Sequence, residues 1–316
     1  MEGVSTEKYV KTATRHTEPQ GIIKNLFWNQ QQKIAPYLFI APFYLLFVIF
    51  MGYPLISSLV MSLYEMRGFQ SRIFVGIGNF TDLFRDPIFW KSLKNTSYFA
   101  VGTLTLQLPI ALLLAILLNS KFVRGKNILR LAFFAPVLVA GVFVAIIFNL
   151  VYDQRAGLVN QEFVLFGKEI GWLNEEKYVM PAVILTGVWQ WAGFNMIYFL
   201  AGLQGIRQEL YEAAAVDGAS WWQAFIHVTL PSLRPVIAFV FVVSMIGSLQ
   251  LFDLPFILTN GGEPADAGST IVMYLYKNGF QFMRLGYAAT IGWVLFFIIA
   301  VISIVQLKLL GIFRDE

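Results

Sequence analysis

The sequence predicts an all-α integral membrane protein with six transmembrane helices. Of its 316 residues, 57% are hydrophobic and only 13% are charged, whereas soluble domains usually contain about 25% charged residues. Six long segments are nearly free of Asp, Glu, Lys and Arg, and a helix needs about 20 apolar residues to cross a bilayer. The expected spans are therefore 36–63, 95–119, 131–152, 179–204, 235–258 and 286–308.

Two other interpretations of the apolar segments fit the sequence less well. Six buried core helices of this length are hard to accommodate in one soluble protein. The strands of a membrane barrel would alternate apolar and polar residues over about ten positions, and these segments show no such alternation.

A polar stretch, 1–33, precedes the first span. The apolar part of a cleavable signal peptide would lie closer to the start of the chain, so we expect the first span to remain as an anchor. The sequence thus predicts a polar cytoplasmic tail, 1–33, and a six-span transmembrane domain, 34–316.

The basic residues set the expected orientation. With an even number of spans, both termini lie on the same side of the membrane. That side carries 13 Lys and Arg residues against 10 on the other, and its short loop 121–130 has four of them and no acid. Because short loops rich in Lys and Arg stay in the cytoplasm, we expect both termini there.

The composition excludes several kinds of site. The chain has no cysteine and only two histidines, which excludes disulfides and thiolate metal sites and disfavours a histidine metal site. It lacks the Gly-x-x-x-x-Gly-Lys-Ser/Thr pattern, so we expect it to bind no cofactor and to hydrolyse no ATP itself. A net charge of +4 is modest for this length and does not indicate a nucleic-acid partner.

The loop between the fourth and fifth spans, 207–232, has the pattern of two short helices with a sharp turn between them. Gly218 follows a stretch of helix formers and tolerates the positive φ that ends a helix. Ser220 and Gln223 fit a capping box for the second helix, which Pro231 is expected to close. Such a unit can dock another protein or pack on its own bundle, and amphipathicity alone does not decide between them.

The spacing within this loop is distinctive. It reads Glu212-Ala213-Ala214, three residues, Gly218, nine residues, Val228, one residue and Leu230-Pro231. This spacing resembles the EAA motif of ABC-importer permeases, in which isoleucine usually stands at the position of Val228. The surrounding ELYEAAAVDGA is similar to the carbohydrate-uptake branch, the maltose-type permeases, many of which carry proline at the position of Arg207.

Other segments support the same resemblance, which runs from about residue 35 to the C-terminus. They are APYLF at 35–39, WLN at 172–174, YFLAGLQ at 198–204 and TNGG at 259–262. Glu263 stands where this family usually has proline.

The resemblance implies the fold of type I (MetI-like) ABC importer permeases and a coupling loop, 207–232, that docks into a groove on a separate ATPase subunit. The coupling residues it implies are Glu212, Ala213, Ala214, Asp217, Gly218 and Ala219. The implied partners are a second homologous permease, two ATPase subunits that bind ATP and magnesium, and an extracytoplasmic solute-binding protein. The chain would then import a sugar or oligosaccharide through the lipid bilayer of the bacterial cell membrane.

Two helix faces are candidates for the substrate path. Residues at i, i+4 and i+7 share a helix face, which groups Trp189 with Gly193 and Met196, and Ser244 with Ser248 and Leu251. The resemblance places the translocation cavity on roughly these faces. The candidate path residues are Trp189, Gly193, Met196, Ser248, Gln250 and Leu251.

Purely structural roles are the alternative to a role in the substrate path. Aromatic residues near span ends form interfacial belts, and Gly and Ser inside spans often serve helix packing. Asp253 either has a function, as intramembrane acids commonly do, or is simply hydrated at the interface.

Two other functions stay open at this point. A secondary transporter of a small polar solute, driven by an ion gradient, would carry charged coupling residues in the middle of its spans, and apart from Asp253 near one end the six segments have none. An integral-membrane enzyme would need clustered His, Asp, Glu or Cys residues, which the sequence does not show.

Overall fold

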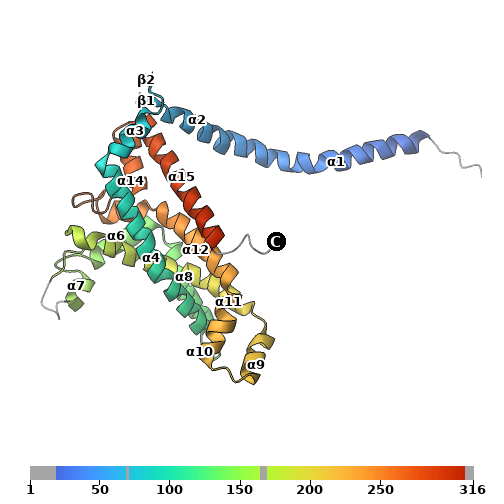
Figure 1. Ribbon diagram of the computed structural model, residues 1–316, viewed down its shortest axis with the longest axis vertical. Helices are drawn as coiled ribbons and strands as arrows, with labels where there is room; N and C mark the ends of the chain where they lie inside the picture. The colour runs from blue at the N-terminus through green and yellow to red at the C-terminus, as the bar shows by residue number, and fades with distance from the viewer. Residues whose placement is uncertain (1–18, 69–70, 164–168, 310–316) are drawn as a thin grey trace, which may run out of the picture. The chain divides into compact units, whose positions relative to one another are not determined.

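Helices make up nearly all of the structure, as the apolar segments predict (Figure 1). The computed structural model describes residues 19–68, 71–163 and 169–309. The chain divides into two units, Met1–Ser57 and Ser58–Glu316. Of the expected tail, residues 1–18 lie outside the described residues, and residues 19–33 begin a helix that continues into the first span.

The first unit is a long helix with one widened turn. α1 (Pro19–Phe47) leads into the π-helical turn η1 (Val48–Gly52), and α2 (Tyr53–Ser62) follows. Pro54 explains the widened turn, because its ring clashes with the carbonyl four residues earlier in a regular α-helix.

Within the described residues, four helices are long and apolar enough to span a membrane, or up to six if each of two bent pairs is one span. The four are Lys33–Ser62, α4 (Pro87–Asn119), α8 (Glu176–Gln204) and α15 (Leu285–Leu309). The bent pairs are α5 (Lys126–Leu138) with α6 (Gly141–Val151), and Trp221–Ser232 with α12 (Arg234–Leu249). Each of these four helices and two bent pairs overlaps one of the six segments that the sequence predicts as spans.

The fifth span is broken, although the sequence predicts one helix over 235–258. α12 ends at Leu249, and α13 (Asp253–Leu258) begins after three non-helical residues. Pro255 supplies the reason, because in a continuous helix its ring would clash with the carbonyl of Leu251. That carbonyl instead accepts a hydrogen bond of 2.9 Å from the hydroxyl of Thr270.

A small hairpin lies at one end of the second unit (Figure 1). β1 (Tyr64–Arg67) pairs antiparallel with β2 (Ser71–Phe74), and α3 (Gly78–Arg85) follows. The amide of Asn79 donates to the carbonyls of Ser62 and Tyr64 at 2.8 and 3.0 Å, which fixes the hairpin to the end of α2. The sequence does not predict this hairpin, because four-residue strands are too short to show a periodicity.

The opposite end carries the loop between the fourth and fifth spans (Figure 1). Its elements are α9 (Gln208–Val216), α10 (Trp221–Ala224), the π-helical turn η3 (Phe225–Thr229) and α11 (Leu230–Ser232). Pro231 does not close the second helix as expected. It lies inside the continuous helical path Trp221–Ser232, just after the π-helical turn η3, and this path bends by 64° only after Ser232.

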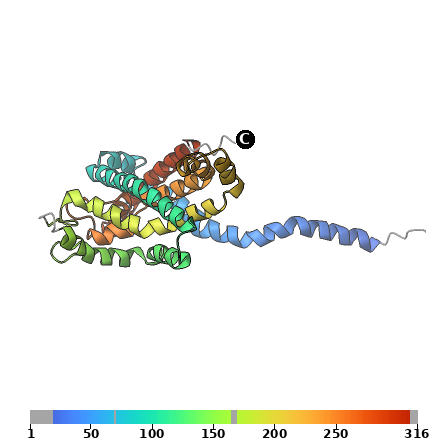
Figure 2. The same cartoon turned by 90° about the horizontal axis from the view of Figure 1, so that it is seen from below.

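α4 and α8 pack against each other and form the centre of the second unit (Figure 2). Their buried apolar side chains include Phe99 and Ala111 on α4 and Val183 and Leu200 on α8. The remaining elements are α7 (Leu158–Phe163), α14 (Ile271–Tyr276) and the π-helical turn η4 (Lys277–Gln281).

Large apolar side chains cover the outer surfaces of the spans. Phe39 on α1, Leu113 on α4 and Val301 on α15 are 84%, 60% and 60% exposed. Soluble monomers rarely expose continuous apolar surfaces of this extent. These surfaces therefore need lipid or a partner subunit to cover them.

Asp86 joins three helices at the hairpin end. It caps α4 by accepting from the Ile88 N–H at 2.8 Å, and it also accepts from the hydroxyls of Tyr287, at 2.8 Å, and Tyr274. Burial alone raises the pKa of this carboxyl, but the hydrogen bonds outweigh it and hold the pKa below its usual value. Burial together with the bond to Asp86 raises the pKa of Tyr274 to about 12.

We expect Asp86→Asn to lower the stability of the chain by about 1 kcal/mol at neutral pH, because hydrogen bonds to a carboxylate are stronger than those to an amide. A carboxyl with a lowered folded pKa contributes stability above its unfolded pKa of about 3.9 and loses it as pH falls through the folded value. Thermal unfolding followed by tryptophan fluorescence should therefore show the difference at pH 7 and a smaller one near pH 3. Asp82→Asn, at an exposed position of α3, is the control. Equal stability of Asp86→Asn and the parent at pH 7 would contradict the role of the carboxylate.

Candidate functional site

A cavity of about 560 Å³ opens among the spans of the second unit. Its walls come from α4, α6, α8, α12 and α13. The volume lies within the range of about 300–1,000 Å³ that is typical of small-molecule sites.

Two helix breaks lie at this cavity. One separates α5 from α6, which differ in direction by 98°, and Gly141 beside it lines the cavity. The other is the break at 250–252, and all three of its residues line the cavity. The amide of Gln190 donates to the carbonyl of Val139 at 3.3 Å, so a side chain of α8 satisfies a backbone group freed by the first break.

The lining combines amides and hydroxyls with aromatic rings. Gln107, Gln190 and Asn195 supply amides, and the amide of Asn195 donates to the Ser244 hydroxyl at 3.0 Å across α8 and α12. The aromatic lining residues are Phe99, Trp191, Phe194 and Phe252. Amides and hydroxyls can exchange hydrogen bonds with a polyhydroxylated solute, while aromatic faces cover its C–H surfaces.

This lining is equipped to form hydrogen bonds with a solute. Among residues 19–68, 71–163 and 169–309, no three His, Cys, Asp or Glu side chains lie close enough to hold a metal ion. The arrangement is that of a solute site made of neutral hydrogen-bonding groups, with one carboxylate, Asp253, at the second break.

The structure divides the six candidate path residues into two sets. Ser248, Gln250 and Leu251 line the cavity, whereas Trp189, Gly193 and Met196 lie outside its lining. The helix face that Trp189, Gly193 and Met196 share packs against other helices and does not line the cavity.

Each residue of the second set has another environment. The ring of Trp189 packs against that of Phe148 of α6 in a tilted arrangement, with ring centroids 5.2 Å apart. Gly193 lies against the backbone of α5, since a Cβ there would be 1.8 Å from the carbonyl oxygen of Phe133. Met196 is fully buried in an apolar cluster with Ala111 of α4.

The cavity side of α8 is instead formed by Gln190, Trp191, Phe194 and Asn195. The amide side chains of Gln190 and Asn195 could have indicated this face from the sequence, because an amide inside a membrane needs a hydrogen-bond partner. Gln107 of α4 also lines the cavity.

The loop at the other end forms a stiff elbow, by which we mean residues 208–232. Gly218 has φ +76°, and the N–H of Ala219 donates to the carbonyl of Ala214 at 2.9 Å, which ends α9 in the manner of a Schellman motif. Ser220 and Gln223 form the predicted capping box at the start of α10. The hydroxyls of Tyr211 and Thr229 meet at 2.9 Å and tie α9 to η3.

The implied coupling residues lie together at the turn of this elbow. Glu212, Ala213, Asp217 and Gly218 are exposed, and Ala214 and Ala219 are half-buried. Trp221 and Trp222 beside the turn are 66% and 58% exposed. The elbow therefore presents small side chains and two aromatic rings on its outer surface.

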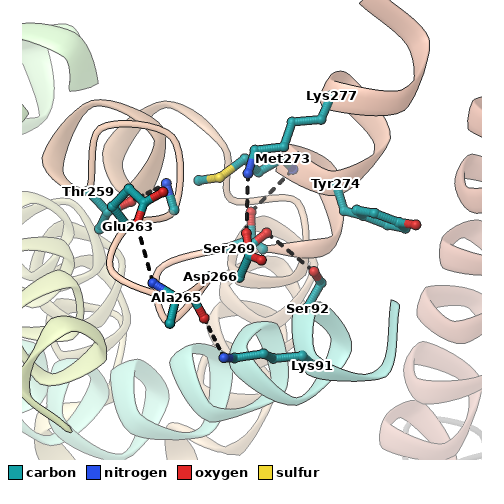
Figure 3. Close-up of polar contacts among 12 residues, drawn as sticks. Lys91, Ser92, Thr259, Glu263, Ala265, Asp266, Ser269, Met273, Tyr274 and Lys277 are labelled. Atoms are coloured by element: carbon teal, nitrogen blue, oxygen red, sulfur yellow. Dashed lines mark hydrogen bonds and ion pairs between the residues drawn. The ribbon is translucent and has the colours of Figure 1, made fainter. Parts of the chain in front are cut away.

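A second structured loop, 259–270, follows α13 (Figure 3). The ammonium group of Lys91 and the hydroxyl of Ser92, both on α4, bond to Ala265 and Ser269 of the loop. An ion pair of 3.3 Å between Lys277 and Asp266 closes its other side. The TNGG segment noted in the sequence thus belongs to a loop that is fixed to the start of α4.

The sequence and the fold are similar to those of known proteins. A family model described as "Binding-protein-dependent transport system inner membrane component" matches residues 107–312. The chain is 41% identical over 315 residues to the arabinooligosaccharides transport system permease protein AraP of Bacillus subtilis (strain 168), covering 98% of this chain and 99% of the relative. It is 39% identical over 275 residues to the lactose transport system permease protein LacF of Rhizobium radiobacter, covering 85% and 92%.

A solved structure is similar over nearly the whole chain. It is a bacterial alginate ABC transporter in complex with an alginate pentasaccharide-bound periplasmic protein, with a TM-score of 0.77, 26% identity, and coverage of 91% of this chain and 96% of the other. The chain therefore belongs to the family of inner-membrane components of binding-protein-dependent transport systems, and it is a multi-pass ABC-importer permease subunit of the bacterial inner membrane.

Proposed function

We propose that this chain passes a sugar or oligosaccharide through the cavity of the second unit, with ATP hydrolysis on a partner subunit supplying the energy. The relatives support this substrate class, since their names refer to arabinooligosaccharides, lactose and alginate. The amide and aromatic lining has the chemistry that a saccharide needs.

One observation carries the proposed coupling. The elbow is joined to both cavity helices by very short connections: α8 ends at Gln204 and α9 begins at Gln208, while only Leu233 separates α11 from α12. Leu233 is fully buried and packs in the apolar cluster of α4 and α8. A force on the elbow therefore reaches α8 and α12 directly, and with them two walls of the cavity.

The proposed roles of the remaining parts follow from this arrangement. Glu212, Ala213, Ala214, Asp217, Gly218 and Ala219 would contact an ATPase subunit that holds ATP and magnesium. The outer loops, 153–177 and 253–284, would face a solute-binding protein, and a second permease subunit would cover part of the exposed apolar surface. Both termini would lie in the cytoplasm, on the side of the elbow.

We expect Gly218→Trp to reduce ATP-driven uptake of arabinotriose about tenfold or more in proteoliposomes that contain the complete transporter and its binding protein. A residue with a Cβ at φ +76° costs roughly 1–2 kcal/mol, which unwinds the turn, and the indole obstructs the docking surface. Gly125→Trp is the matched control, because Gly125 also has a positive φ, +70°, and open space around it. Normal uptake and normal ATPase binding by Gly218→Trp would refute the coupling role.

A further inference from the structure

Asp253 is the one ionisable side chain among the described residues that line the cavity. It begins α13, directly after the second helix break. Gly141, beside the first break, lies opposite, since a Cβ on it would be 3.4 Å from the Cβ of Asp253 and 3.9 Å from its Oδ2. The carboxylate therefore sits where the two broken spans meet.

No counter-ion neutralises this carboxylate within the part of the chain that the structure describes. The ion pairs found there join Arg67 with Glu65 and Lys277 with Asp266. Asp253 is exposed, and it belongs to no group of side chains that could hold a metal ion. Its negative charge is thus free to act on whatever enters the cavity.

The other lining groups are neutral, so this charge dominates the electrostatic potential of the cavity. Low-dielectric walls strengthen the effect of a charge relative to bulk water. A carboxylate accepts strong hydrogen bonds from hydroxyl groups and repels other carboxylates. It therefore favours an uncharged saccharide and disfavours a saccharide of the same size that carries uronic-acid groups.

We propose that Asp253 makes the cavity selective for uncharged saccharides over anionic ones. The inference rests on the proposed function, because it concerns the same cavity. It goes further in naming the charge class of the substrate and the residue that sets it.

The absence of cysteine from the sequence allows a direct test. Gly247 lines the cavity, and a Cβ placed on it meets no atom within 4 Å, so Gly247→Cys introduces one thiol without a clash. The complete transporter is treated with cationic, anionic or neutral methanethiosulfonate reagents, and this subunit is then separated to measure the labelling rate. We expect the cation-to-anion rate ratio to fall about tenfold in Asp253→Asn, because a unit charge is removed from the cavity that holds the thiol.

Two variants complete this arm of the test. Asp253→Glu keeps the charge and should keep the ratio, which separates loss of charge from a disturbed fold. Asp82→Asn removes a carboxylate from α3, outside the cavity lining, and should leave the ratio unchanged. An equal ratio with Asp253 and Asp253→Asn would overturn the proposal.

A second arm measures saccharide selectivity by protection of the Gly247→Cys thiol. Arabinotriose, which is neutral, should slow the labelling by the neutral reagent, whereas trigalacturonate should do so only in the Asp253→Asn variant. Equal protection by both trisaccharides with Asp253 in place would also overturn the proposal. A thiol that reacts with no reagent, or that neither trisaccharide protects in any variant, would instead show that the cavity is not the substrate path and would refute the proposed function.

Discussion

Gly193→Ala is expected to destabilise the chain by about 3 kcal/mol, the upper part of the usual range for overpacking. The added Cβ would be 1.8 Å from the carbonyl oxygen and 2.4 Å from the carbonyl carbon of Phe133. Both are backbone atoms, so no rotation of a side chain can relieve the clash, and α5 has to move away from α8. Close approach of two membrane helices at a small residue is a main source of their packing energy.

Gly247→Ala is the matched control for this substitution. The same methyl group is added to a glycine inside a span, but at Gly247 it meets no atom within 4 Å. Thermal unfolding in detergent and yield in the membrane should separate the two variants clearly. Equal stability of both variants would mean that α5 and α8 do not approach each other closely at Gly193.

Gly247→Trp is expected to reduce uptake about a hundredfold, which corresponds to a loss of about 3 kcal/mol of saccharide binding. Gly247 lines the cavity on α12 and has open space before it, so the indole can enter the cavity without displacing the backbone. The chain should therefore reach the membrane and bind its ATPase as the parent does.

The measurement is arabinotriose uptake by the complete transporter in proteoliposomes, with subunit composition checked on the same sample. Phe239→Trp introduces an indole on the same helix, at a position that is 49% exposed and outside the cavity lining. That variant should transport normally. Full uptake by Gly247→Trp would remove the cavity from the transport path, and equal losses in both variants would point to a general effect on α12.

The spans and the elbow were predictable from the sequence because local signals determine them. An apolar segment in lipid must satisfy its own backbone hydrogen bonds, so length and composition are enough to predict a helix. The elbow depends on contacts between residues a few positions apart, such as the Ser220–Gln223 capping box and the N–H of Ala219 on the carbonyl of Ala214. Gly218 with its positive φ follows from the same local pattern.

The hairpin and the break in the fifth span were harder to predict. The strands Tyr64–Arg67 and Ser71–Phe74 are short segments inside a polar loop. Pro255 favours a break in the helix, but membrane helices often continue through proline when neighbours satisfy the freed carbonyl. Here the freed carbonyl of Leu251 bonds to Thr270, 19 residues along the chain, where no local pattern reveals it.

What the sequence determined by itself is the all-helical membrane fold, the elbow and the family resemblance. Which side of α8 faces the cavity was decided only by the tertiary structure. Gln190 and Asn195 mark one side of α8, but the helix has buried residues on every side, so its apolar pattern gives no preferred rotation about the helix axis. The contact of Gly193 with the backbone of α5 fixes that rotation, which turns Gln190 and Asn195 toward the cavity and Met196 away from it.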